Sequence, residues 1–258
     1  PRDVQVTDPI EGRASCHVAE AEWRFLGWLE RQGFEYDLYA ETQLHFGQLD
    51  LDAYRVLIIT THPEYWSEDM YFGLKRWVFE RGGKLMYLGG NGLNCKIEML
   101  DEQTMKVYNG DAREQARRGA ESRFHLYAES EANLLGVVFT DPGIMTAAPY
   151  EVIDADHWIF AGTGVEQGER FGEASLHMRI PGGASGHETD KTSPSSPANV
   201  HIVARGTNPD NGGAEIVHFD TDSGGAVFSV GSITYPASIL VDDVVSSITE
   251  NVLSRFLT

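Results

Sequence analysis

The stretch from Arg55 to Gly92, RVLIITTHPEYWSEDMYFGLKRWVFERGGKLMYLGGNG, decides the fold of this chain. The six residues after Arg55, VLIITT, are apolar or β-branched, as in a strand that is buried on both faces. Ser67 is a favourable N-cap followed by acidic residues, and it predicts a helix that runs to about Glu80 and stops at two glycines. A second apolar run at 84–88 predicts the next buried strand. Strand, helix and strand in this order are the unit of a parallel sheet with a crossover helix.

The same kind of pattern extends on both sides of this stretch. Before it, we expect a helix at 17–32 and a strand at 34–39, where apolar and polar residues alternate. After it, we expect strands at 200–204, 215–219 and 226–230, and a closing helix at 237–256. The sequence therefore predicts an α/β fold with an open, mostly parallel sheet flanked by helices. We expect residues 1–258 to form a single domain, with an irregular insertion at about 97–198.

The composition excludes several classes of protein. The 258 residues include 20 Lys and Arg against 39 Asp and Glu, which gives a formal net charge of −19. Such a charge argues against nucleic acid and anionic membranes as partners, because both are recognised by clustered basic residues. No apolar window is long enough to span a bilayer. Two cysteines, Cys16 and Cys95, are too few for a disulfide framework, so we expect a reducing, cytoplasmic location.

His62-Pro63-Glu64 directly follows the first buried strand, where ligands of open α/β sheets bind. Pro63 fixes its own φ and restricts His62 to extended geometry, so the turn is rigid. An imidazole and a carboxylate on a rigid turn suit metal binding or general acid–base chemistry. The alternative is structural: His62 bonds a backbone carbonyl and Glu64 leads into the next helix.

Gly89-Gly90-Asn91-Gly92 follows the second buried strand. Enzymes with a nucleophile elbow have Ser or Cys at the centre of such a turn, and here that position is Asn91. An amide is no nucleophile, but it can orient or polarise a substrate carbonyl; the alternative is a plain Asn-Gly turn. Cys95 lies four residues further on and is a second candidate nucleophile, although no histidine is fixed beside it.

Two further segments carry charged side chains. Gly186-His187-Glu188-Thr189-Asp190 lies in a glycine-rich loop, where Glu188 is either a general base or part of a solvated surface. A basic group, formed by Arg113, Arg117, Arg118 and Arg123, either attracts an anion or forms a salt-bridged helix face.

The chain resembles the C-terminal part of the large subunit of the N,N-dimethylformamidases. The stretch from Thr61 to Gly92 carries the resemblance most specifically. Three others follow the family in the same order, namely WRFLGWLERQGFEYDLYAE, GGASGHETDK and GGAVFSVGSITYPASILVDDVVSSITENVLSRF. Similarity therefore covers most of the chain and is weakest in its middle.

The resemblance implies a flavodoxin-like fold of the class I glutamine amidotransferase kind that lacks the cysteine nucleophile, in agreement with Asn91 at the elbow. It also implies hydrolysis of N-substituted formamides to formate and an amine. The family uses a mononuclear ferric iron held by two tyrosines and one glutamate, and Glu64 matches that glutamate. His62, Asn91 and Glu188 resemble the residues that surround the iron and contact the substrate.

The chain departs from the family in one respect. The two tyrosine ligands of the family lie upstream in a β-rich domain, and Tyr36, Tyr39 and Tyr54 do not match them. We therefore expect this chain to be the C-terminal part of a longer protein, with the upstream domain and a small subunit as partners in an oligomer. The expected substrate is a small neutral amide, attacked by water with iron as Lewis acid, Asn91 as oxyanion donor and Glu188 as base. The alternatives are a cysteine-dependent hydrolase and a non-catalytic domain that serves assembly.

Overall fold

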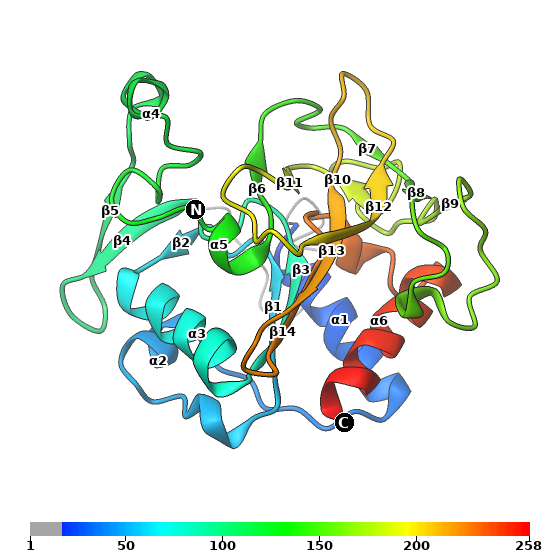
Figure 1. The fold of residues 1–258 in the computed structure, drawn as a ribbon, viewed down its shortest axis with the longest axis horizontal. Coiled ribbons are helices and arrows are strands. Elements are labelled where there is room, and N and C mark those ends of the chain that lie inside the picture. The colour runs from blue at the N-terminus through cyan, green and yellow to red at the C-terminus, as the bar shows by residue number, and fades with distance from the viewer. Residues whose placement is uncertain (1–16) are drawn as a thin grey trace, which may run out of the picture.

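A computed structural model describes residues 17–258, so Cys16 lies outside the described residues. Its centre is a seven-stranded sheet with the strand order β1-β3-β14-β13-β12-β8-β9 (Figure 1). The bounds of these strands are β1 Val56–Thr61, β3 Lys84–Gly89, β14 Ala226–Ser229, β13 Glu215–Asp220, β12 His201–Gly206, β8 Tyr150–Val152 and β9 Arg170–Phe171. The predicted strands at 55–61, 84–88, 200–204, 215–219 and 226–230 are all present within a few residues.

The sheet is mixed, so the prediction of a mostly parallel sheet is wrong. β3 pairs in parallel with β1 and with β14, whereas every pairing from β14 to β9 is antiparallel. The reason lies in the connections. Only residues 221–225 join β13 to β14, and a link this short permits only an antiparallel hairpin. The α/β class itself is confirmed.

Alternate residues of the central strands point into two different cores, one on each face of the sheet. On β3, Met86 and Leu88 face the core that is covered by α1 (Ala19–Gln32) and α6 (Asp243–Leu257). Leu85 and Tyr87 face the core that is covered by α3 (Glu68–Arg81) and α5 (Ala132–Leu135). Figure 1 shows α1 and α6 on one side of the sheet, and α3 with the short α2 (Glu41–His45) on the other. The central strand β3 is therefore buried on both faces, as its apolar run predicted.

Two of the predicted elements differ from the structure. Residues 34–39 form no strand, and Tyr36, Leu38 and Tyr39 are exposed there. Their alternating pattern has no neighbouring strand to pair with, and a strand without a partner is not stable in water. The closing helix begins at Asp243 and not at Ala237, because the Asp242 carboxylate accepts a hydrogen bond from the Val245 amide at 3.0 Å and caps the helix there.

The predicted insertion contains more structure than its irregular sequence indicates. A three-stranded sheet joins β2 (Tyr65–Trp66), β4 (Cys95–Met99) and β5 (Met105–Tyr108), and it leads to α4 (Ala112–Arg118), which projects from the body of the molecule (Figure 1). Two small pairs join β6 (Val138–Thr140) to β11 (Thr189–Lys191) and β7 (Ala147–Ala148) to β10 (Ser185–Gly186). Single 3-10 turns lie at Leu51–Ala53, Trp158–Phe160 and Tyr235–Ala237. Among residues 17–258, no helix is both long and apolar enough to cross a membrane.

Candidate functional site

The candidate site lies at the carboxyl ends of β1 and β3. These strands are parallel neighbours, and the last residue of each, Thr61 and Gly89, are partners in the pairing. The two segments that follow, 62–66 and 90–94, are therefore held beside each other at one edge of the sheet. This is the edge at which open α/β sheets bind ligands.

The turn after β3 is held in a left-handed conformation. Asn91 has φ 53°, a value that Asn tolerates better than most residues do. A Cβ atom at Gly90 would lie 2.4 Å from the Glu188 carbonyl oxygen, so this position has room only for glycine. The buried Asp190 carboxylate accepts hydrogen bonds from the backbone N–H of Asn91 and from the Tyr87 hydroxyl, both at 2.8 Å. The turn and the loop at 186–190 thus fix each other.

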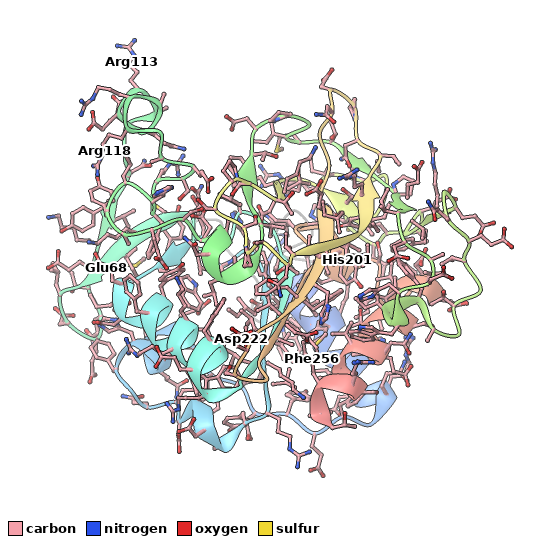
Figure 2. All side chains as sticks on the ribbon, viewed as in Figure 1. Glu68, Arg113, Arg118, His201, Asp222 and Phe256 are labelled. Atoms are coloured by element: carbon pink, nitrogen blue, oxygen red, sulfur yellow. The ribbon has the colours of Figure 1, made fainter. Side chains whose placement is uncertain are left out.

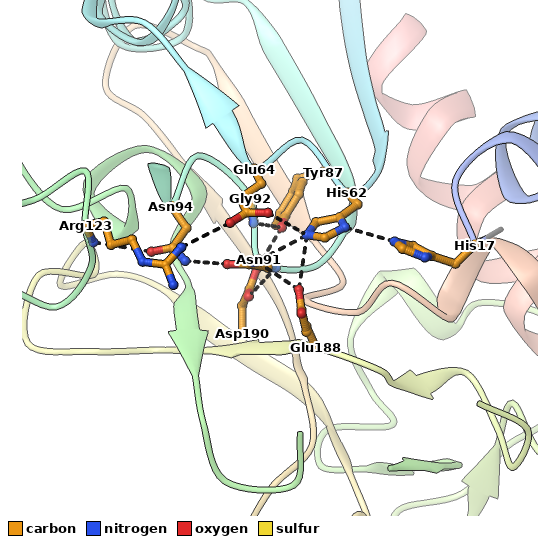
Figure 3. A network of polar contacts seen from close by, with 10 residues as sticks. All are labelled: His17, His62, Glu64, Tyr87, Asn91, Gly92, Asn94, Arg123, Glu188 and Asp190. Carbon is orange, nitrogen blue, oxygen red and sulfur yellow. Dashed lines mark hydrogen bonds and ion pairs between the residues drawn. The ribbon is translucent and has the colours of Figure 1, made fainter. Parts of the chain in front are cut away.

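His62, Glu64, Asn91 and Glu188, the four residues singled out from the sequence, meet in one polar network (Figure 3). His62 Nε2 lies 3.1 Å from Glu188 Oε2 and 3.4 Å from Glu64 Oε2. Asn91 Nδ2 donates to Glu188 Oε2 at 2.8 Å and lies 3.2 Å from His62 Nε2. Each of the three charged side chains is at most 20% exposed. The structure therefore gathers residues from three separate segments of the chain.

The charges of this network favour an imidazolium between two carboxylates. Burial alone would lower the pKa of His62, but the hydrogen bonds and charges of Glu188 and Glu64 outweigh burial and raise that pKa to about 9. Burial would likewise raise the pKa of Glu188, yet His62 and Asn91 bring the pKa of that carboxyl below its usual value. At neutral pH His62 Nε2 therefore carries a proton and cannot accept one from Asn91. The second N–H of the Asn91 side chain therefore has no acceptor in His62.

His17 completes the network from the start of the described chain. Its Nε2 lies 3.0 Å from His62 Nδ1, and it packs against the rings of His187 and His177. Burial, together with the positive charges of His62 and Arg179, lowers the pKa of His17 to about 4. A neutral His17 can accept the Nδ1 proton of His62, which fixes the orientation of the His62 ring.

On the opposite side of the network, Arg123 Nη1 lies 3.3 Å from Glu64 Oε1. Asn94 links Asn91 to Arg123. Its side chain donates to Asn91 Oδ1 at 2.6 Å and accepts from the backbone N–H of Arg123 at 3.3 Å. The other members of the basic group lie on α4, away from the site, and Figure 2 shows Arg113 and Arg118 pointing outward. Arg117 pairs there with Glu114 at 2.6 Å, as a salt-bridged helix face would.

Cys95 does not have the surroundings of a nucleophile. Its side chain is buried, and its thiol lies 3.6 Å from the Tyr108 carbonyl oxygen. Burial raises the pKa of the Cys95 thiol, whereas a reactive cysteine needs a lowered one. This geometry gives no support to the cysteine-dependent alternative.

Residues 17–258 contain no group of three or more His, Cys, Asp or Glu side chains that is arranged to hold a metal ion. Glu64 is the candidate that a metal could use, since its carboxylate lines a cavity next to the network. The neighbouring Arg123 and His62 hold both of its oxygens in place. The described residues can thus contribute one ligand, but they do not form a complete centre.

Sequence reasoning missed the supporting residues. Asp190, Tyr87 and Arg123 act through contacts that join positions 59 to 103 residues apart. His17 has no motif around it, and only its place at the start of the helix expected at 17–32 could have drawn attention to it. The loop at 186–190, with its two alternatives, proves to be largely buried and to form part of two small strand pairs.

The fold and the site together define an α/β protein with an imidazole, two carboxylates and an amide at the carboxyl edge of its sheet. The chain belongs to the family described as N,N-dimethylformamidase beta subunit-like, C-terminal, whose model matches residues 2–246. Two curated relatives agree with this assignment. The N,N-dimethylformamidase beta subunit of Alcaligenes sp is 28% identical over 96% of this chain, and that of Paracoccus aminophilus is 27% identical over the same share. The chain spans 38% of the length of each relative.

Proposed function

We propose that this chain supplies one side of an amide-hydrolysing centre of the N,N-dimethylformamidase type, which converts N-substituted formamides to formate and an amine. The observation that carries the proposal is the convergence of His62, Glu64, Asn91 and Glu188 on one shielded network. Membership of the family supports the proposal independently.

In this mechanism, Glu188 accepts a proton from the attacking water. Its carboxyl is ionised at neutral pH, since the pKa of Glu188 is held below its usual value by His62 and Asn91 against the opposing effect of burial. Asn91 donates its second N–H to the formyl oxygen as negative charge develops there. Glu188 then returns the proton to the nitrogen of the leaving amine.

His62 positions these groups and stabilises their charge. Its protonated ring lies between Glu64 and Glu188, and its positive charge compensates the repulsion between the two carboxylates. His17 orients the ring of His62, and Asn94 orients the side-chain amide of Asn91. The reacting groups are thereby oriented before the substrate binds.

We further propose that Glu64 ligates a mononuclear ferric iron together with two tyrosines outside this chain. Carboxylate and phenolate oxygens are hard donors that suit such an ion, and bound iron would supply Lewis acidity toward the substrate. The remaining ligands would come from an upstream β-rich domain, and a small subunit and an oligomeric assembly are part of the same proposal. The free thiol of Cys95 suits a cytoplasmic location.

The turn of Asn91 supports a relationship with glutamine amidotransferase-like folds. It follows a central parallel strand and has the left-handed backbone of a nucleophile elbow. We propose that the nucleophile of such a fold is replaced here by an oxyanion donor.

The test is formate release from N,N-dimethylformamide by the intact protein, combined with metal analysis. We expect about one iron per chain, and a loss of roughly 10²- to 10⁴-fold in kcat for Glu188→Gln. Glu250→Gln is the matched control, since Glu250 is an exposed side chain on α6. Full activity of Glu188→Gln would remove Glu188 from the mechanism. Absence of formate release by wild-type protein that contains iron would favour the non-catalytic alternative.

A further inference from the structure

A cavity of about 370 Å³ opens next to the polar network and shares His62 and Glu64 with it. Its volume lies within the range of about 300–1,000 Å³ that is usual for small-molecule sites. Asn91 and Glu188 do not line it. The cavity therefore adjoins the proposed reaction centre on the side of Glu64.

The walls of this cavity are apolar and rich in methionine. Met99 and Met105 are direct partners in the pairing of β4 with β5, so their side chains lie on the same face of that small sheet. Ile97 lies two residues before Met99 on the same face, and Met70 comes from α3. Methionine is flexible and polarizable, and surfaces built from it accept ligands of different shapes.

The rim of the cavity is acidic. Glu41 at the start of α2 and Glu102 in the turn between β4 and β5 both line it and are both exposed. No Lys or Arg side chain is among the lining residues, and the positive charge of the lining His62 is paired with Glu64 and Glu188. The cavity thus combines an apolar wall with negative charge at its mouth, which is complementary to an alkylammonium ion.

We propose that this cavity binds the N-alkyl groups of the amide substrate and, after hydrolysis, the alkylammonium product. The inference rests on the proposed function, because it places the formyl group at the network and the nitrogen substituents beside Glu64. N,N-dimethylformamide has two methyl groups and leaves most of such a cavity empty. The substrate class that fits is that of formamides with larger apolar substituents on nitrogen.

Binding, not turnover, is the first test. We would titrate the intact protein with N,N-dibutylformamide, N,N-dimethylformamide and dibutylammonium chloride by calorimetry. Each methylene that leaves water contributes about fourfold in affinity, so the dibutyl amide should bind at least about tenfold more tightly than the dimethyl amide. Equal binding of the two amides would overturn the proposal.

Two sets of variants distinguish the contribution of the apolar wall to binding from that of the acidic rim. Met105→Trp fills the cavity and should weaken both dibutyl ligands at least about tenfold, while Val241→Trp, at an exposed position outside the lining, should not. Glu41→Gln with Glu102→Gln should weaken dibutylammonium about three- to tenfold at low salt and leave the neutral amide unchanged. The control pair is Glu173→Gln with Glu250→Gln, both exposed and outside the cavity. Unchanged binding in Met105→Trp, or an equal loss of amide and ammonium in the rim variant, would contradict the assignment.

The same proteins separate this inference from the proposed function. If formate is released from N,N-dimethylformamide but the dibutyl ligands bind no more tightly, the cavity assignment fails and the function stands. If the dibutyl ligands bind as expected and no formamide is hydrolysed by protein that contains iron, the function fails, and with it the assignment of the cavity to a substrate.

Discussion

Seven of the nine histidines gather in two clusters, and only one of the clusters lies beside well-shielded carboxylates. The site cluster contains His17, His62, His177 and His187. The α6 cluster contains His157, His201 and His218, and it packs against Trp158 and against Phe256 of α6. Figure 2 labels His201 and Phe256, which lie far from the projecting α4.

The clusters differ in the carboxylates that reach them. In the site cluster, His62 lies between Glu64 and Glu188, which are only 13% and 20% exposed. In the α6 cluster, His218 faces Asp220 at 3.5 Å and His201 faces Asp154 at 2.8 Å. These two carboxylates are 76% and 35% exposed, so water screens them more than it screens Glu64 and Glu188. What distinguishes the site cluster is therefore the pair of shielded carboxylates and the fixed amide beside its imidazoles.

The largest difference between the clusters should appear in activity. We expect His62→Gln to lower kcat by roughly 10²- to 10⁴-fold, because it removes the charge between the two carboxylates. His201→Gln removes the contact with Asp154 at 2.8 Å in the α6 cluster and should leave kcat unchanged. Formate release at saturating substrate measures both. Equal losses in the two variants would show that the comparison is wrong.

A somewhat smaller loss is expected from the amide. Asn91→Asp keeps the shape and the left-handed backbone but removes both N–H donors, so kcat should fall by about 10²- to 10³-fold. Asn211→Asp is the matched control, since Asn211 is exposed and has φ 54°. A change in KM with an unaltered kcat would show that Asn91 binds the substrate without acting in the transition state.

The supporting histidine should have a weaker effect. His17→Ala removes the acceptor for His62 Nδ1, and residues that act through another group typically contribute about 10- to 100-fold. His17→Asn, whose side-chain oxygen can still accept a hydrogen bond, should recover part of this loss. The equivalent change His157→Ala in the α6 cluster should not alter kcat. Identical activities of the Ala and Asn variants would contradict a positioning role for His17.

The smallest effect concerns stability and pH in the α6 cluster. Burial, together with the charges of His218 and His201, lowers the pKa of His157 to about 4, whereas an unfolded histidine has a pKa near 6.5. The unfolded state therefore binds the proton first, and this contribution to stability is complete above pH 6.5 and declines as the pH falls toward 4. Between pH 7.5 and pH 5, His157→Gln should therefore lose less unfolding free energy than wild type. The difference is about 1 kcal/mol once solvent screening of this half-buried ring is allowed for, as measured by urea unfolding. A parallel decline of the two proteins would remove His157 as the cause.

Much of the fold followed from the sequence, because it depends on local patterns. The apolar runs of β1 and β3, and Ser67 as the cap of α3, lie where they were predicted. The direction of the strands from β13 to β9 did not follow, since apolar runs do not reveal the pairing partner. The segment 34–39 had the alternation of a strand but no neighbour to pair with.

The site was predictable where its residues follow buried strands. His62, Glu64 and Asn91 stand directly after β1 and β3, and parallel strands bring their carboxyl ends to one edge. The polar loop gave Glu188 two alternatives, general base or solvated surface, and only the resemblance to the family favoured the first. A residue 97 positions beyond Asn91 carries no local signal of where it lies in the fold.

The sequence by itself determined the α/β class, the family and four side chains of the network, since these depend on local periodicity and on motifs. Only the tertiary structure decided the mixed sheet, the approach of His17 and Arg123, and the cavity beside Glu64. The physical reason is that burial, hydrogen bonding and charge are properties of neighbours in space. Burial would lower the pKa of His62, but Glu188, 126 positions away in the chain and 3.1 Å from the ring, acts together with Glu64 to raise that pKa to about 9.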